Sequence, residues 1–179
     1  IQNVAGNYET DLLKPLLDEV QRLAGQSDAE RAANLTPYRV IADHVRASAF
    51  LIADGVTPGN IGRNYICRMI IRRAARFARK LGLKDPFMAG VAAIVVENYG
   101  EAYPELRRSA RLIADTLTRE ERRFNETLDA GFAELGAQIA ARSPLPIPAD
   151  ANAPAARRMR SVSSVNEIRR SPSTTASAS

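Results

Sequence analysis

The residues best placed to do chemistry are arginines that recur at helical spacing in the middle of the chain. Between Asn60 and Leu81 there is no aspartate or glutamate, and cations recur every three or four residues, at Arg68, Arg72, Arg76 and Arg79. A row of like charges repels itself, so it requires either acidic partners elsewhere in the fold or a bound polyanion. A Gly-Asn turn before this helix also exposes backbone N–H groups, which suit phosphate. Charge alone leaves both explanations open.

Other reactive side chains are few. The single histidine, His44, excludes a metal site built from paired histidines, and the single cysteine, Cys67, excludes an internal disulfide. We expect His44 to be partly buried beside a bonded neighbour and Cys67 to be a small core residue. Asp43, Asp54 and Asp115 could be carboxylate sites, but we prefer ion pairs with the arginines. The sequence shows no phosphate-binding glycine loop, metal-ligand cluster or base-stacking platform.

The overall composition is that of a globular protein with a modest basic excess. The chain has 179 residues, 45% of them hydrophobic, a formal charge of +5 and a pI of about 9.8. This balance allows nucleic-acid binding without requiring it. One cysteine, no signal peptide and no membrane-length apolar run predict a cytoplasmic protein that spans no membrane. Because the chain begins with Ile1 in an apparently ordered segment, we interpret it as a piece of a longer protein.

The elements that position these groups are predicted to be helices. Apolar periodicity and capping signals predict helices over 11–24, 36–53, 61–81 and 86–98, with one short helical turn within 26–34. The basic helix should bury a stripe formed by Ile66, Ile70, Ala74, Phe77 and Leu81. The last segment, 104–141, is either one continuous helix or two, the second beginning at a capping box at Thr118. Its packing stripe is Leu117, Phe124, Leu128, Phe132, Leu135 and Ile139.

These elements predict an all-α bundle of about five to six helices, because no convincing strand pattern occurs. We assign residues 1–142 to this helical domain. From residue 143 the composition turns to Pro, Ser, Ala and Arg, and large apolar residues become scarce. Such a segment cannot bury enough apolar surface to offset its ordering entropy, so we expect 143–179 to be a disordered basic tail.

Several motifs in this order resemble bacterial alanyl-tRNA synthetases. They are NYETD at 7–11, RVIADHVR at 39–46, IADGVTPGN at 52–60, RNYICRMIIRRA at 63–74 and TREERRFNETLDAG at 118–131. The family reads RVIADHxR, then ADGVxPSNxGRGYxLRRIIRRA, and later TxEExxFxxTLxxG. The resemblance covers the chain from about Asn7 to Ala141, and the tail after Ala141 matches no part of the family pattern.

The resemblance implies a part in alanine–tRNA ligation, in which a class II enzyme uses ATP to attach alanine to its tRNA. This helical region would bind the tRNA acceptor stem, with Asn60 matching the asparagine that reads a G·U pair. An amide offers both a donor and an acceptor to base edges in the shallow minor groove of an A-form stem. The accompanying tRNA-binding residues would be Arg63, Asn64, Arg68, Arg72, Arg73 and Arg76. These arginines would hold backbone phosphates or brace the helix internally.

The chain also departs from the family pattern. Gly59 replaces the serine of P-S-N, Asn64 replaces the glycine of R-G-Y, and Met69 replaces the second arginine of L-R-R. The class II motifs, the aspartate-bearing Y-D-T-Y-G-F-P segment and the zinc-binding editing domain have no counterpart in the chain. We therefore expect no catalytic residue and no cofactor in this segment, and no activity of the isolated chain. ATP, Mg²⁺ and editing-domain zinc are implied for the full-length enzyme.

The alternative is a non-catalytic helical module, derived from the synthetase, that binds RNA or a protein. A third explanation is a structural bundle whose arginines pair with Asp43, Glu97, Glu120 and Glu121. In the synthetase interpretation this domain packs on the missing class II core. The apolar surface that meets that core would also allow self-association.

Overall fold

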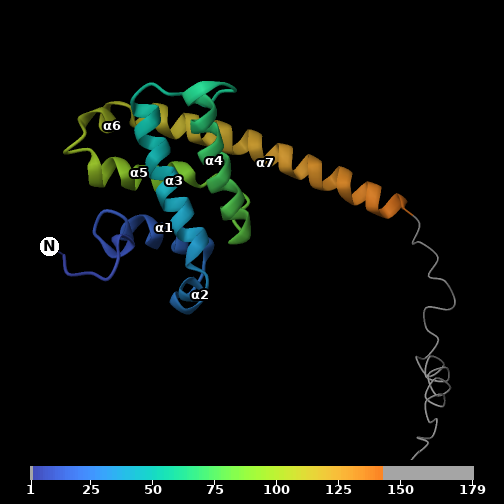
Figure 1. Cartoon of the computed structure of the whole chain (residues 1–179), viewed down its shortest axis with the longest axis horizontal. Coiled ribbons are helices and arrows are strands. Elements are labelled where there is room, and N and C mark those ends of the chain that lie inside the picture. The colour runs from blue at the N-terminus through green and yellow to red at the C-terminus, as the bar shows by residue number, and fades with distance from the viewer. Residues whose placement is uncertain (1, 143–179) are drawn as a thin grey trace, which may run out of the picture. The chain divides into compact units, whose positions relative to one another are not determined.

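The structure is a computed structural model that describes residues 2–142 as helices joined by short connections (Figure 1). These residues form seven α-helices and no strand, which confirms the predicted all-α class, with more helices than the expected five to six. The chain divides into a compact unit, Ile1–Gly136, and a second unit, Ala137–Ser179. The predicted disordered tail, 143–179, lies outside the described residues.

The chain order of the elements is a short 3-10 turn followed by the seven helices. Their bounds are η1 (Asn7–Glu9), α1 (Lys14–Ala24), α2 (Asp28–Ala33), α3 (Leu35–Ala53), α4 (Gly62–Lys80), α5 (Met88–Tyr99), α6 (Pro104–Arg108) and α7 (Ala110–Ala141). Within residues 2–142, none of these helices combines the length and the apolar character needed to cross a bilayer.

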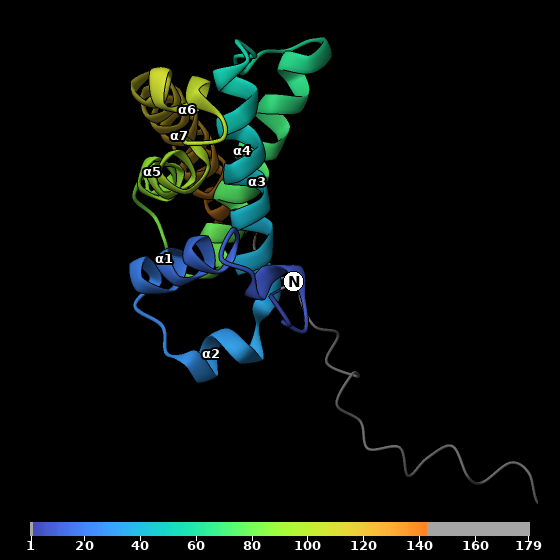
Figure 2. The same ribbon diagram turned by 90° about the vertical axis from the view of Figure 1, so that its left-hand side faces the viewer.

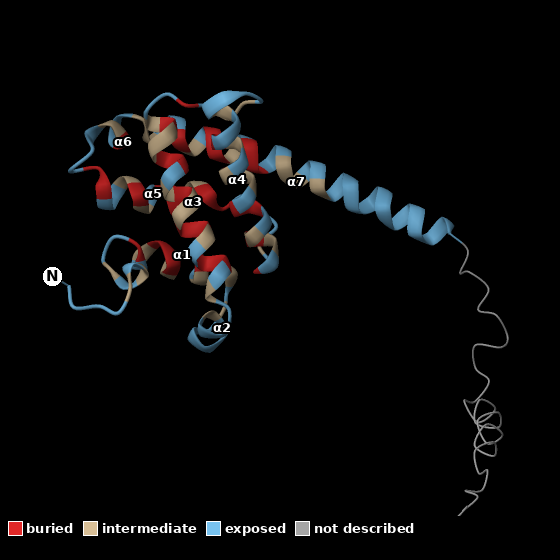
Figure 3. Cartoon of the chain, in the orientation of Figure 1, coloured by how far each residue is buried: buried red, intermediate tan, exposed pale blue. Residues whose placement is uncertain are grey.

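α3 is the central helix of the first unit and contacts α1, α2, α4, α5 and α6 (Figure 2). It buries one face completely, and Figure 3 shows that buried residues gather on α3 and on the helices around it. The fully buried side chains of this face include Tyr38, Ile41, Val45, Ala49 and Ile52. Each large apolar side chain removed from water contributes about 1.5–3 kcal/mol. The most extensive packing is between α3 and α4, so this core sets the position of the basic helix.

The N-terminal helices differ from the prediction at their starts. α1 begins at Lys14 rather than Asp11, because the Thr10 hydroxyl does not cap it but donates to the carbonyl oxygen of Asn7 at 2.6 Å. Its predicted end is confirmed: Gly25 adopts φ 64°, a left-handed conformation that favours glycine. α2 is a six-residue helix with a capping box, in which Ser27 and Glu30 bond each other's backbone N–H groups.

The predicted buried stripe of α4 is confirmed at Ala74 and Leu81 and wrong at its other three positions. Ile66 is 48% exposed, and Ile70 and Phe77 are only partly buried. The buried face of the helix consists mostly of small side chains, at Cys67, Ala74, Ala75 and Ala78, together with Ile71. Small residues allow α4 to approach α3 closely, whereas the periodicity argument gave weight to the larger residues at adjacent positions.

α5 begins at Met88, later than predicted from Asp85-Pro86, and its N-terminus is capped by a side chain from α7. The backbone N–H groups of Phe87 and Met88 donate to the Glu121 carboxylate at 3.1–3.2 Å. The two amides would otherwise be unpaired at a buried helix end. Burial raises the pKa of Glu121 to about 7, although the two backbone hydrogen bonds act in the opposite direction.

The last predicted segment forms two helices, but they divide at Ser109 rather than at Thr118. Thr118 lies inside α7, and Glu121 caps α5 instead of completing a capping box at Thr118. The N-terminal half of α7 buries Ile113 and Leu117. The predicted stripe fails further along, since Phe132, Leu135 and Ile139 are 66%, 52% and 64% exposed, and every described residue from Gly131 onward is exposed (Figure 3). No other element of residues 2–136 covers Phe132 or Leu135.

Candidate functional site

The turn between α3 and α4 presents Asn60 to solvent and is held from within α4. Asn60 is exposed, and its side-chain oxygen Oδ1 accepts a hydrogen bond from Nη1 of Arg68. The other terminal nitrogen of Arg68, Nη2, donates to the carbonyl oxygen of Pro58 at 3.4 Å. One guanidinium therefore holds two points of the turn. The bond from Arg68 fills one of the two acceptor positions of Oδ1, so the Asn60 side chain keeps one acceptor position and the two N–H donors of Nδ2.

The turn is closed by a close approach between Gly59 and Asn64. The Gly59 N–H donates to the backbone oxygen of Asn64 at 2.9 Å. A Cβ atom added at Gly59 would lie 2.7 Å from the Cβ of Asn64, closer than real Cβ atoms come to a neighbour. Positions 59 and 64 thus have room for one Cβ between them. Gly59 and Asn64 therefore form a compatible pair, although each separately departs from the synthetase pattern.

Two of the predicted site arginines face the interior of the bundle and share a carboxylate on α7. Glu120, whose side chain is 7% exposed, accepts a hydrogen bond from Nε of Arg72 at 2.8 Å, and Nε of Arg68 lies 3.3 Å from the same oxygen. A second link joins Arg79 to Asp129 at 3.0 Å. Opposite charges at these distances and this burial fix α7 against α4.

The other predicted site residues lie on the outer side of α4 or at its start. Arg63, Arg73 and Arg76 are exposed, and Asn64 is partly buried under the turn. Arg73 and Arg76 border a pocket together with Arg72, and its remaining lining is His44, Met69, Ile70 and Phe124. The structure thus divides the predicted set: Arg68 and Arg72 are engaged internally, whereas Arg63, Arg73 and Arg76 are open to solvent.

The side chains considered as reactive groups have structural surroundings. Burial, with a contribution from the charge of Arg73, lowers the pKa of half-buried His44, which favours the neutral ring at pH 7. Cys67 is fully buried, and burial raises the pKa of its thiol to about 11, which confirms it as a core residue. The carboxylate of Asp43 accepts a hydrogen bond from the Tyr8 hydroxyl at 2.5 Å. Among residues 2–142 there is no group of three or more metal-ligating side chains.

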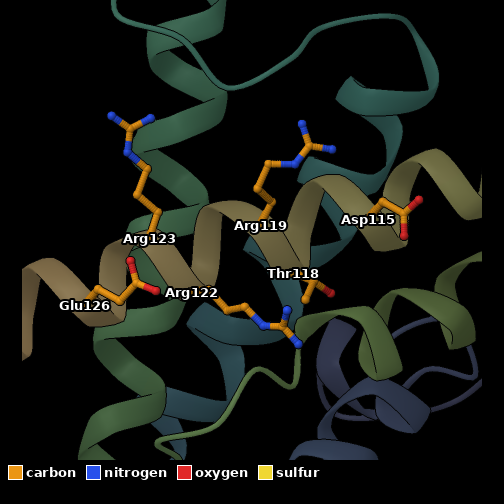
Figure 4. A pocket seen from close by; sticks show the side chains of 6 residues that line it. All are labelled: Asp115, Thr118, Arg119, Arg122, Arg123 and Glu126. Carbon is orange, nitrogen blue, oxygen red and sulfur yellow. The ribbon is translucent and has the colours of Figure 1, made fainter.

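A second basic surface, on α7, was not predicted. Arg119, Arg122 and Arg123, drawn in Figure 4, are exposed. The two glutamates between them in the sequence, Glu120 and Glu121, are buried. Arg119 and Arg123 border a pocket of about 360 Å³ whose opposite lining includes Thr57 and Pro58 of the turn. The sequence held a signal for this surface: in T-R-E-E-R-R, helical periodicity places Arg119 and Arg123 on one face. Interpretation of T-R-E-E-R-R as a helix start considers only Thr118 and Glu121 and therefore does not predict the basic face formed by Arg119 and Arg123.

The explanation that the arginines pair internally with acidic residues is supported for one of its four proposed carboxylates. Glu120 pairs with arginines of α4, as expected for internal bracing. Glu121 bonds backbone N–H groups instead, and Asp43 bonds Tyr8. Internal pairing therefore accounts for part of the arginine row and leaves its exposed members without that explanation.

Comparison with known proteins identifies the family. The sequence pattern of the family described as tRNA synthetases class II (A) matches residues 1–147. The alanine–tRNA ligase of Herpetosiphon aurantiacus is 46% identical over 138 residues, which are 77% of this chain and 16% of that protein. The alanine–tRNA ligases of a Roseiflexus species and of Chloroflexus aurantiacus are 47% and 44% identical, over 78% and 83% of this chain and 15% and 17% of those proteins. The chain thus spans about 16% of the length of such relatives, and it belongs to the class II (A) tRNA synthetase family, within which it is similar to a segment of alanine–tRNA ligases.

Proposed function

We propose that this chain is the part of an alanine–tRNA ligase that binds the tRNA acceptor stem, and that Asn60 reads the G·U pair of that stem. The observation that carries the proposal is the exposed amide of Asn60, held by Arg68 on the turn between α3 and α4. The turn lies in the segment whose motifs resemble the synthetase reader. It also precedes α4, whose first backbone N–H groups lack partners within the helix.

The orientation of the amide defines what Asn60 would recognise. Because Oδ1 already accepts from Arg68, Asn60 offers mainly the two N–H donors of Nδ2, with one acceptor position of Oδ1 remaining. Acceptors for them in the shallow minor groove of an A-form stem are uracil O2 and ribose 2′-hydroxyls. We therefore assign to Asn60 the role of a donor, and to Arg68 that of the residue that orients it.

The exposed arginines of α4 supply affinity in this proposal. Arg63, Arg73 and Arg76 would bind backbone phosphates, together with Asn64 at the start of the helix, whereas Arg68 and Arg72 brace α4 against α7. Phosphate contacts position an RNA without specifying its sequence, so sequence preference would depend on Asn60.

We propose that ATP-dependent attachment of alanine takes place in the remaining part of a longer cytoplasmic protein, on the class II core. The described residues contain no metal-ligand cluster, so no step is assigned to Mg²⁺ or zinc in this segment. Exposed apolar side chains at the start of α4 are suited to pack on that core: Ile61, Tyr65, Ile66 and Met69 are 83%, 50%, 48% and 44% exposed. Without the core, this apolar surface would favour self-association.

The test is binding of the chain to two acceptor-stem minihelices that differ only in a G·U or G·C pair at the identity position. We expect tighter binding to the G·U stem, and loss of that preference in Asn60→Ala. The matched control is Asn98→Ala, which removes an exposed amide from α5. Equal binding of both stems by the unmodified chain would refute the reading role of Asn60.

The second candidate function is a non-catalytic RNA-binding or protein-binding module, supported by the basic face that α4 exposes. It predicts salt-sensitive binding without preference for alanine tRNA over other tRNAs. Measuring the affinity of the chain for alanine tRNA and for one other tRNA at two salt concentrations separates the two candidate functions. A purely structural role of all the arginines predicts no salt-sensitive binding to either tRNA.

A further inference from the structure

The exposed side of residues 118–123 on α7 is positively charged, although the sequence of this segment is nearly neutral. Residues 118–123 contain three arginines and two glutamates, so their formal charges nearly cancel. Glu120 and Glu121 are only 6% and 1% exposed, and both carboxylates are engaged inside the bundle, with Arg72 and with the N-terminus of α5. Arg119, Arg122 and Arg123 remain exposed. Folding therefore separates the two signs within residues 118–123, where the guanidinium groups are the exposed charges, although Asp115 and Glu126 on the same helix are exposed as well.

Two of these arginines lie beside the turn that carries Asn60. Figure 4 shows Arg119 and Arg123 projecting to one side of α7 and Arg122 projecting to the other. Arg119 and Arg123 border the same pocket as Thr57, Pro58 and Arg68. Since Arg68 bonds Asn60 directly, one side chain connects this pocket to the amide.

Neither Arg119 nor Arg123 forms an ion pair in the described part of the chain. The carboxylate nearest in the pocket lining, Glu120, is bound to Arg72. Like charges at positions i and i+4 on a helix are mutually destabilising. The exposed acids beside them, Asp115 and Glu126, line a pocket with both arginines but form no ion pair with either in residues 2–142, and Asp115 pairs with Arg111 instead. Two parallel guanidinium groups are suited to a ligand with regularly spaced oxyanions, since each can bind phosphate oxygens in a bidentate manner.

We propose that Arg119 and Arg123 bind the phosphodiester backbone of the RNA whose base edge Asn60 contacts. This inference rests on the proposed function for the identity of the RNA and adds a second helix to its binding surface. The turn and α7 would then contact one stem from the two sides of the pocket, with α7 supplying charge and the turn supplying sequence preference.

The test measures the minihelix affinity of the full chain as a function of salt concentration. Arg119→Gln/Arg123→Gln should weaken binding of the G·U and G·C stems equally, by about five- to tenfold at low salt. The slope of log K against log salt should fall by about 1 per arginine. The matched control is Arg111→Gln/Arg122→Gln, which removes two charges from α7 outside this pocket and should change both quantities less. Thermal unfolding confirms that the exposed substitutions leave the fold intact.

The outcomes separate this proposal from the reading role of Asn60. A reduced slope without G·U preference supports the α7 contact and refutes the reading role. G·U preference with an unchanged slope overturns the α7 contact and points to a different ligand for this face, such as an acidic protein surface. Equal losses of affinity in Arg119→Gln/Arg123→Gln and in the control Arg111→Gln/Arg122→Gln also overturn the proposal, because the change in net charge alone would then explain the effect. No binding to either stem at about 50 mM salt overturns it as well.

Discussion

The close approach of Gly59 and Asn64 predicts that Gly59→Ala destabilises the protein and that Asn64→Gly restores it. In the parent, Gly59 donates to the backbone of Asn64, and an added Cβ would lie 2.7 Å from the Cβ of Asn64. That Cβ is fixed by the first turn of α4 and cannot rotate away. The alanine variant must therefore move the turn or lengthen the hydrogen bond that closes it.

The expected cost follows from opposing contributions to the free energy of unfolding. Overpacking costs about 1–3 kcal/mol, and weakening the turn hydrogen bond adds about 1 kcal/mol. Replacing glycine lowers the conformational entropy of the unfolded chain, which stabilises the folded state by about 0.4–1 kcal/mol. We therefore expect Gly59→Ala to lose about 1–3.5 kcal/mol. Asn64→Gly alone should lose only about 0.3–0.5 kcal/mol, the difference between the helix propensities of the two residues.

The assay is a double-mutant cycle by urea denaturation. The double variant Gly59→Ala/Asn64→Gly should be more stable than Gly59→Ala alone, with a coupling energy of about 1–3 kcal/mol. The same arrangement, a side chain at 59 and glycine at 64, is the one in the synthetase motif pattern. Minihelix binding provides a second readout, since displacement of the turn in Gly59→Ala should reduce the G·U preference of Asn60.

Two results would refute this reasoning. If Gly59→Ala is as stable as the parent, the turn accommodates a Cβ, and the close approach does not restrict it. If the two substitutions are additive within about 0.5 kcal/mol, the positions do not compete for the same space.

Two further predictions concern the carboxylates of α7. Because burial raises the pKa of Glu121 from 4.5 to about 7, its stabilising contribution is complete below pH 4.5 and is lost as the pH rises through 7. The free energy of unfolding should therefore be larger at pH 5 than at pH 8, by up to about 3 kcal/mol from this group. Glu121→Gln should reduce that difference. An unchanged pH dependence in this variant would contradict the assignment. Glu120→Ala should cost about 3 kcal/mol in urea denaturation, because it leaves Arg68 and Arg72 without their shared partner, whereas the exposed control Glu126→Ala should cost less than about 0.5 kcal/mol.

The helices were predictable from the sequence where local signals determine them. Gly25 and Gly82 end α1 and α4 in left-handed conformations, and the family motifs located the turn that carries Asn60. Apolar periodicity found α1, α4 and α5 because each buries a face on α3. It misplaced the buried face of α4, since alanine and cysteine contribute little to an apolar pattern yet permit the closest packing.

The errors that concern the site arise from contacts distant in sequence. Glu121 lies 34 residues from Phe87, so local spacing does not identify this contact. Glu120 lies 48 residues from Arg72, and the sequence predicts it only as one of four possible partners of the arginines. The residues from Thr118 to Glu121 fit the capping-box pattern, but they lie inside α7. Glu121 caps the N-terminus of α5 instead. The α7 arginines acquire their significance only after both glutamates have been buried.

Arg68 makes the turn and the bundle thermodynamically dependent on each other. Its guanidinium contacts Asn60 and Pro58 at the turn and lies beside Glu120 on α7, so any change in one contact alters its position in the others. A ligand that strengthens the Asn60–Arg68 contact must also favour the paired state of Glu120, and by reciprocity the paired state of Glu120 must raise the affinity of that ligand by the same factor. Recognition of a single base pair at the surface would thereby increase the cohesion of α4 and α7 in the interior.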